Sequence, residues 1–405
     1  MALFSQEFYV KDRLAIAITS MVRSGSFLYL GLTSGQRSLI AYDLETGKFH
    51  PLPAVFPWVK DRGYCTKIHN ALGVLADGSL LLGEGNHFTW DGIPVTCAYF
   101  DQELPEFMLA RKQAQGFPDV KYSDFCLENL NAWNRRRDNP GGKIVRFDPS
   151  SGDSSVLASL PPYLYVQSMI VDSERNQAYG HTIPDNHFFH LNLNNGKLTD
   201  HGRISDYAFH NLAIAPNGIC YGAWVDKADS QLKLLRFDPN KERLDHLETP
   251  ILSNIGPKVA GNQGIDQWIT TRDGSMYVGT VADASLLRFD WERETFSLVF
   301  AKLAEARVTS LDEDDDGMIW IGAGYPHMQL IRFHPGDNSM LNFGRVNQSY
   351  PRCYFHAACC YQNKLFLGET DGFSPSLHVV DLQPLRRNIT CPQPAAREML
   401  LQQSH

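Results

Sequence analysis

The chain has 405 residues, of which 43% are hydrophobic and 20% charged, so it has enough apolar residues to bury a large core and lacks the composition of a disordered protein. Lys and Arg number 37 against 45 Asp and Glu, and the resulting net charge of −8 argues against a nucleic-acid-binding protein. No apolar run approaches the roughly 18 residues of a membrane-spanning helix, and the N-terminal stretch lacks the features of a signal peptide. We therefore expect a cytoplasmic protein with no membrane partner, unless the chain begins after a removed signal.

The eight cysteines show no Cys-x-x-Cys spacing, and two of them, Cys359 and Cys360, are adjacent in an apolar run. This usage favours buried, reduced thiols in a cytoplasmic protein. A Cys/His metal site built from distant residues is the alternative.

A short motif recurs along the chain. It consists of an apolar or aromatic strand that ends in an acid or another polar residue, followed by a turn and a second strand. Its seven occurrences are centred on Asp43, Asp148, Asn192, Asp238, Asp290, His334 and Asp381. They recur roughly every 45 residues, except that the first interval is about twice as long, which is the period of a repeat architecture.

A second motif alternates with the first and consists of two apolar strands joined by a tight turn. Its turns fall at Ser24-Gly25, Asp77-Gly78, Glu174–Asn176, Asn217-Gly218, Asp273-Gly274, Asp316-Gly317 and Gln362-Asn363. Asp-Gly and Asn-Gly between apolar runs are strong hairpin signals. Two hairpins per period make a four-stranded antiparallel unit, so the sequence predicts an all-β fold, a seven-bladed β-propeller.

The last unit lacks an outermost strand after Leu382, and we expect the N-terminal stretch Glu7–Val10 to supply it. Residues 1–392 would then form a single propeller domain, followed by a C-terminal tail at 393–405.

One interval within the second blade is more than 50 residues too long, and it corresponds to an insertion at residues 87–142. Its segments 101–113 and 126–138 have the composition of short helices. Loops of this length on a compact scaffold are usually functional or disordered. The aromatic residues of the insertion, Trp133 among them, favour an ordered lid. The run Arg135-Arg136-Arg137 is usually a solvated helix face, but in a lid Arg137 could bind a carboxylate.

Polar residues collect where the first strand of a blade begins and the second ends, positions that meet near the central channel of a propeller. Five of them are histidines, namely His69, His87, His181, His210 and His356. The others include Tyr165, Gln167, Tyr207, Gln263, Arg307, Glu369 and Asp371. Each one alone has a simpler structural interpretation as a hydrogen-bonded strand residue. Their recurrence beside the long insertion favours a functional pocket.

Histidine suits general acid–base catalysis near neutral pH, and with carboxylates it also binds divalent metals. His356, Glu369 and Asp371 are the predicted ligands of such a metal, which would be calcium, zinc or manganese; no cofactor is required by a motif. The sequence has no Gly-x-Ser-x-Gly elbow, P-loop, His-Glu-x-x-His or dinucleotide fingerprint.

The combination of Lys67-Ile-His69, Gly85-Asn-His87, the long insertion leading to Pro140-Gly-Gly, and Gly368-Glu-Thr-Asp371 resembles the seven-bladed propeller polysaccharide lyases. These include short ulvan lyases and rhamnosyl-glucuronate lyases, with a related branch of rhamnosidases. The resemblance implies β-elimination at a uronic acid, in which His, Tyr and Arg remove the C5 proton, protonate the leaving oxygen and neutralise the carboxylate.

On this resemblance the two blade-2 histidines of the family match His69 and His87. The sequence departs from the family at Asn139, where a tyrosine is expected, and at His210, where an arginine often stands. The predicted catalytic residues are His87, His69, His210, Tyr165 and Tyr207. The predicted substrate-binding residues are Arg307, Arg137, His181, Gln167, Gln263 and Trp133.

The predicted partner is therefore an acidic oligosaccharide, bound by a monomer or homodimer. Two alternatives remain open. A glycoside hydrolase of the rhamnosidase type needs two carboxylates, for which Glu84 and Glu369 are the obvious pair. A non-catalytic propeller that binds a ligand or protein should instead expose a contiguous apolar patch.

Overall fold

The structure is a computed structural model, which describes residues 5–13, 15–34, 37–57, 66–86, 106–119, 140–183, 185–205, 212–225, 231–252, 264–350, 352–370 and 375–386. The chain divides into two compact units, which we describe separately. The N-terminal unit comprises residues 8–208 and 368–377, and the C-terminal unit comprises residues 1–7, 209–367 and 378–405.

The described strands form seven antiparallel sheets, each built around four strands. The fold is therefore the all-β, seven-bladed propeller that the sequence predicts. Within the described residues, no helix is both long and apolar enough to cross a membrane.

Three of the sheets belong to the N-terminal unit. The first contains β2 (Ala17–Ser24), β3 (Phe27–Ser34), β4 (Leu39–Asp43) and β5 (Lys48–Pro51), with the short strands β6 (Thr66–Lys67) and β9 (Gly85–Asn86) added beside β3. The second contains β7 (Leu72–Val74), β8 (Leu80–Gly83), β10 (Lys143–Asp148) and β11 (Asp153–Ser159). The third contains β12 (Tyr165–Asp172), β13 (Gln177–Ile183), β14 (His187–Asn192) and β15 (Lys197–Arg203).

Three further sheets belong to the C-terminal unit. The fourth contains β16 (Ala213–Ile214), β17 (Cys220–Val225), β18 (Leu232–Asp238) and β19 (Arg243–Pro250). The fifth contains β20 (Ile265–Thr270), β21 (Met276–Thr280), β22 (Leu286–Asp290) and β23 (Thr295–Phe300). The sixth contains β24 (Val308–Glu313), β25 (Ile319–Ala323), β26 (Gln329–His334) and β27 (Ser339–Arg345).

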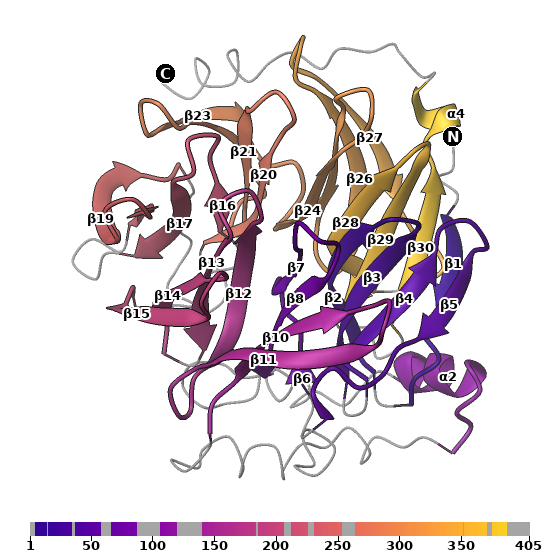
Figure 1. The fold of residues 1–405 in the computed structure, drawn as a ribbon. Helices are drawn as coiled ribbons and strands as arrows, with labels where there is room; N and C mark the ends of the chain where they lie inside the picture. The colour runs from indigo at the N-terminus through magenta and orange to yellow at the C-terminus, as the bar shows by residue number, and fades with distance from the viewer. Residues whose placement is uncertain are drawn as a thin grey trace, which may run out of the picture. The chain divides into compact units, whose positions relative to one another are not determined.

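The last sheet takes strands from both ends of the chain, in the order β28 (Tyr354–Tyr361), β29 (Lys364–Thr370), β30 (Ser376–Asp381) and β1 (Ser5–Tyr9). Figure 1 shows the indigo strand β1 beside the yellow strand β30. The prediction that the N-terminal stretch completes the last blade is confirmed. The short helix α4 (Gln383–Arg386) follows β30.

Local chemistry explains why the hairpin turns fall where the sequence predicts them. In the second blade, Asp77 Oδ1 accepts a hydrogen bond of 3.0 Å from the backbone N–H of Ser79, and Gly78 has a φ of 84°, which favours glycine. All seven predicted turns lie between the first and second strands of their blades.

The acidic residues of the first repeat motif stabilise the turn between the third and fourth strands of a blade. Asp43, Asp148, Asp238 and Asp290 each end a third strand and accept a hydrogen bond from the backbone N–H two residues later. Hydrogen bonds to these carboxylates lower the pKa of each one. The motif therefore specifies the turn into the fourth strand of the blade.

The insertion contains one described helix, α2 (Glu106–Ala114), which overlaps the first stretch predicted to be helical, 101–113, and ends one residue beyond it. The second predicted stretch, 126–138, lies outside the described residues. The strand that follows the insertion, β10, begins at Lys143, directly after the predicted end of the insertion.

Candidate functional site

The first strands of four blades carry a register shift close to their start. The shifts lie between Ile18 and Ser20, Val166 and Ser168, Ile265 and Gln267, and Val308 and Ser310. The residues in the middle of these shifts are Thr19, Gln167, Asp266 and Thr309. Such bulges re-aim side chains and are common next to functional sites.

In the C-terminal unit, three of the residues at blade starts form a chain of charge-assisted hydrogen bonds. Arg307 Nε donates to Asp266 Oδ2 at 2.7 Å, and Arg307 Nη2 donates to Asp266 Oδ1 at 3.0 Å. Arg307 Nη2 also donates to His356 Nε2 at 3.1 Å. The three side chains come from the starts of the fifth, sixth and seventh blades, as the repeat predicts for Arg307 and His356.

The direction of the last hydrogen bond sets the chemistry of the histidine. A guanidinium only donates, so Nε2 of His356 is the unprotonated nitrogen and the ring proton lies on Nδ1. His356 is therefore held as a neutral imidazole with its basic nitrogen against a cation. The residue is 7% exposed, and the Arg307 side chain is 14% exposed.

The backbone of Arg307 is itself unusual, with a φ of 57° in the left-handed region. Its N–H donates to Val281 O at 2.8 Å, and its carbonyl accepts from Gly324 N at 2.9 Å. A non-glycine residue in this conformation costs about 1–3 kcal/mol and persists where surrounding contacts fix it, often at functional sites. Nothing in the sequence signals this conformation.

Aromatic rings and a second arginine adjoin the Asp266–Arg307–His356 chain. The ring of Tyr354 lies 5.5 Å from the imidazole of His356 and 5.9 Å from Cζ of Arg307. Tyr325 meets Tyr354 edge-on at 5.2 Å, and Cζ of Arg352 lies 5.1 Å from the ring of Tyr325. The cluster thus places two guanidiniums, one carboxylate and a neutral imidazole around the buried ring of Tyr354 and the half-buried ring of Tyr325. The two cations outnumber the one anion, which suits the binding of an anionic group.

Four of the predicted catalytic and substrate-binding residues lie in the N-terminal unit and are nearly fully buried. His69 Nδ1 donates to the carbonyl oxygen of Gln167 at 2.9 Å, which leaves Nε2 as the basic nitrogen. Ser168, next to Gln167, pairs with His181 across β12 and β13. Tyr165 begins β12 and is 0% exposed. His69, Gln167 and His181 therefore occupy neighbouring strand ends of the second and third blades.

Seven further predicted residues lie outside the described part of the chain. They are His87, His210 and Tyr207 among the catalytic predictions, Arg137, Gln263 and Trp133 among the substrate-binding ones, and Asp371 among the metal ligands. Their roles, and the predicted convergence of five histidines, stay predictions.

The two described residues of the predicted metal site have cationic neighbours. His356 contacts Arg307, as described above. Both carboxylate oxygens of Glu369 accept hydrogen bonds from Arg111 of α2, Oε1 from Nη1 at 2.6 Å and Oε2 from Nη2 at 2.7 Å. A fixed guanidinium at each group disfavours a second cation there.

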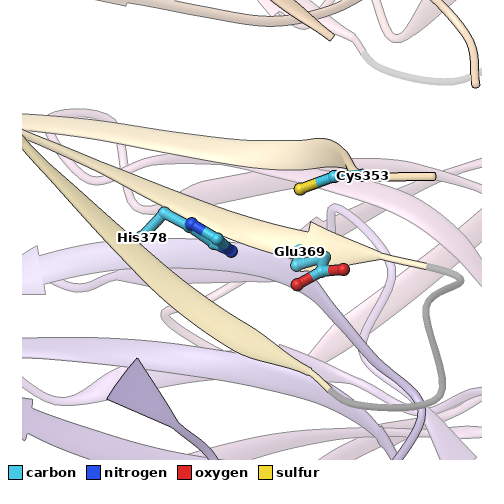
Figure 2. Close-up of side chains that lie close together, drawn as sticks. All are labelled: Cys353, Glu369 and His378. Carbon is cyan, nitrogen blue, oxygen red and sulfur yellow. The ribbon is translucent and has the colours of Figure 1, made fainter. Parts of the chain in front are cut away.

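Within the described residues, one group of three potential ligands lies close together: one residue directly precedes β28, and the other two lie on β29 and β30. Figure 2 shows these side chains, Cys353, Glu369 and His378, whose ligand atoms lie within 4.8 Å of one another. Because Arg111 already neutralises Glu369 in a bidentate pair, the arrangement is better explained as a buried ion pair with polar neighbours than as a metal centre.

Helix α2 is held in place by buried polar contacts within the N-terminal unit. Besides the pair of Arg111 with Glu369, Lys112 Nζ donates to the carbonyl oxygens of Asp12 and Ala15, the second at 2.9 Å. Lys112 is 0% exposed, and burial lowers its pKa to about 8. The described part of the insertion is therefore attached to the blades by charged side chains.

Comparison with known proteins shows the fold alone. No family model matches the chain, and no curated protein matches it. Among solved structures, it is similar to a catalytically inactive histidine-to-alanine variant of virginiamycin B lyase from Staphylococcus aureus with quinupristin, at 10% identity and a TM-score of 0.58, covering 93% of this chain and 99% of that chain.

The chain is also similar to two further solved structures. The RRP9 WD40 repeats match at 11% identity and a TM-score of 0.55, covering 95% of this chain and 99% of that chain. YCF48 bound to a D1 peptide matches at 9% identity and a TM-score of 0.54, covering 93% of this chain and 94% of that chain. The structural neighbours thus include a lyase, a set of WD40 repeats and a protein bound to a peptide.

Proposed function

We propose that the protein is a carbon–oxygen lyase that cleaves uronate-containing oligosaccharides by β-elimination at the Asp266–Arg307–His356 chain. The observation that carries the proposal is the contact between Arg307 Nη2 and His356 Nε2 at 3.1 Å. It sets a basic nitrogen beside the cation that would bind the substrate carboxylate. The sequence predicts this binding role for Arg307 and a metal-ligand role for His356; the hydrogen bond supports an acid–base role for His356 instead.

The elimination needs these two groups together. A proton on the carbon next to a carboxylate is weakly acidic, and a guanidinium that binds the carboxylate stabilises the charge that develops there as the proton leaves. Nε2 of His356 takes the proton from C5 once the substrate carboxylate accepts the hydrogen bond of Arg307 Nη2 in its place; the C4–O bond breaks and a C4=C5 double bond forms. His356 then passes this proton to the leaving oxygen, which restores the neutral imidazole. A neutral imidazole is the base that this step requires near neutral pH.

Asp266 is a positioning residue in this scheme. The two carboxylate oxygens of Asp266 hold the guanidinium of Arg307 in one orientation and balance the charge of Arg307. Asp266 itself is 1% exposed. The folded protein thus supplies the arginine in a fixed orientation before substrate arrives, which lowers the cost of ordering it during the reaction.

The similarity to virginiamycin B lyase supports the proposal only by showing that this fold carries a lyase and that a histidine-to-alanine change inactivates it. The hydrolase alternative has less support, because Glu369 is paired with Arg111 and Glu84 Oε2 accepts from the backbone N–H of Lys143 at 3.0 Å. No specific observation favours the binding propeller: the large apolar side chains that are exposed among the described residues are Tyr9, Val156, Leu252 and Leu298, which come from four different segments.

The test is a panel of uronate-containing oligosaccharides, followed by ultraviolet absorbance of the unsaturated product. His356→Gln and Arg307→Lys should each lower kcat/KM by at least about 100-fold. His334→Gln is the matched control, because His334 is an exposed histidine of the sixth blade that contacts Asp337. Reducing ends released without new absorbance would replace the lyase by a hydrolase, and no turnover on the panel would contradict the proposal.

A further inference from the structure

A pocket of about 120 Å³ lies at the edge of the sixth blade, within the C-terminal unit. Its walls come from the segment before β24, the turn between β25 and β26, and the facing ends of β26 and β27. The side chains that give it chemical character are Glu305, Tyr325, His327, Gln329 and Arg345. At about 30 Å³ for each molecule of liquid water, the pocket has room for about four waters, or for one ligand of about five or six non-hydrogen atoms.

Two opposite charges stand at the rim of this pocket. Glu305 and Arg345 are both exposed, and they come from different segments of the blade. Within the part of the chain that the structure describes, neither side chain takes part in an ion pair. A free cation would be repelled by Arg345, and a free anion would be repelled by Glu305. A ligand that carries both charges meets an opposite charge at each end.

The edge formed by β26 and β27 supplies hydrogen-bond donors for the anionic end of such a ligand. Arg345 lies directly opposite Gln329 in the pairing of these two strands. Oε1 of Gln329 accepts a hydrogen bond of 2.5 Å from Nδ2 of Asn342, so the NH₂ group of the Gln329 amide is left to donate. A guanidinium and an amide NH₂ on opposite partners of a strand pair suit a carboxylate.

The histidine of the pocket adds no charge to its walls. Burial and the charge of Arg345 lower the pKa of His327, so the ring is neutral at pH 7. Its Nδ1 atom is buried and has no hydrogen-bond partner among the described residues. A buried nitrogen of this kind is usually satisfied by a bound water or ligand. The walls therefore combine one negative group, one positive group and a neutral polar ring that lacks a partner.

We propose that this pocket binds a small zwitterion, a free α-amino acid of the size of glycine or alanine. Its carboxylate accepts hydrogen bonds from Arg345 and Gln329, and its ammonium group donates to Glu305. The half-buried ring of Tyr325 forms the apolar wall beside the carbon atoms of the ligand. The inference does not depend on the proposed function, because it names a second ligand rather than a part of the oligosaccharide.

The experiment measures binding to the full-length protein at pH 7 by saturation-transfer NMR. The probes are L-alanine, which carries both charges, and acetate and methylammonium, which carry one charge each. All three have a methyl group whose signal can be observed. L-Alanine should bind with a Kd in the millimolar range, because exposed charges bind weakly, and at least about fivefold more tightly than either single-charge probe.

Two variants remove one charge each without changing the size of the pocket much. Glu305→Gln and Arg345→Gln should each weaken the binding of L-alanine about fivefold. The matched controls are Glu292→Gln and Arg293→Gln, two adjacent exposed residues at the turn between β22 and β23, which should leave the Kd unchanged. No binding of L-alanine to the wild type, or equal losses in the controls, would overturn the proposal. Acetate or L-leucine bound as tightly as L-alanine would overturn it as well.

A charge exchange separates the bridging of two charges from a general effect of the substitutions. In Glu305→Arg/Arg345→Glu the two charges change places, and glycine, which has no side chain, can turn end for end between them. The double variant should therefore bind glycine at least about threefold more tightly than Glu305→Arg alone. Equal binding by the single and double variants would contradict the proposal, and neither result bears on the cleavage of oligosaccharides.

Discussion

The buried ion pair that fastens the insertion helix gives the sharpest prediction about stability. Arg111 donates to both oxygens of Glu369, and their side chains are 7% and 0% exposed. Replacing Arg111 with Met leaves a buried carboxylate without its cation. Breaking a buried pair in this way costs about 3–5 kcal/mol, against about 0–1 kcal/mol for an exposed pair.

Urea unfolding of Arg111→Met, measured by fluorescence, tests this magnitude. The matched control is Arg13→Ala, which breaks the ion pair of Arg13 with Asp119 of the insertion. This pair is more exposed, with 33% of the Arg13 side chain and 75% of the Asp119 side chain accessible to solvent. The double variant Arg111→Met/Glu369→Gln should recover part of the loss, because it leaves no buried charge. A cost below about 1 kcal/mol for Arg111→Met, or one equal to that of Arg13→Ala, would refute the reasoning.

Two further predictions follow from other parts of the structure. Deleting residues 1–10 removes β1 from the last sheet, together with the hydrogen bond of 2.9 Å from Tyr350 to Glu7. The deletion should lower the melting temperature sharply in a calorimetric scan. An unchanged melting temperature would contradict the role of β1. Burial raises the pKa of Asp312 to about 7, above its usual unfolded value, so the folded state binds more protons and loses stability as the pH rises from about 4 to 7. Asp312→Asn should flatten this dependence in unfolding curves collected across that range, and equal slopes would contradict the assignment.

The fold was predictable because its signals are short-range and repeated. Asp77-Gly78 and Asp316-Gly317 specify their turns with neighbouring residues alone, and the recurring acids specify the turns between third and fourth strands. The pairing of β1 with β30 followed from counting, since the last repeat had three strands where the others had four.

The site was predictable only in part. The positions of Arg307 and His356 at blade starts follow from the repeat, but their mutual contact joins residues 49 positions apart. Arg307 also adopts a left-handed backbone that no local pattern encodes. The pairing of Glu369 with Arg111 joins residues 258 positions apart across an insertion that lies outside the repeat. From the sequence alone, Glu369 is a carboxylate at a strand end, a position that suits a metal ligand, and its partner Arg111 cannot be inferred.

The measurement that tests the central claim most directly is mass spectrometry of the products formed from a uronate-containing oligosaccharide. Elimination yields a new end that is lighter by one water than the product of hydrolysis and carries a double bond. The wild type and His334→Gln should form this product, and His356→Gln should form at least about 100-fold less in the same time. Saturated products, or an unsaturated product undiminished in His356→Gln, would contradict the assignment of His356 as the base.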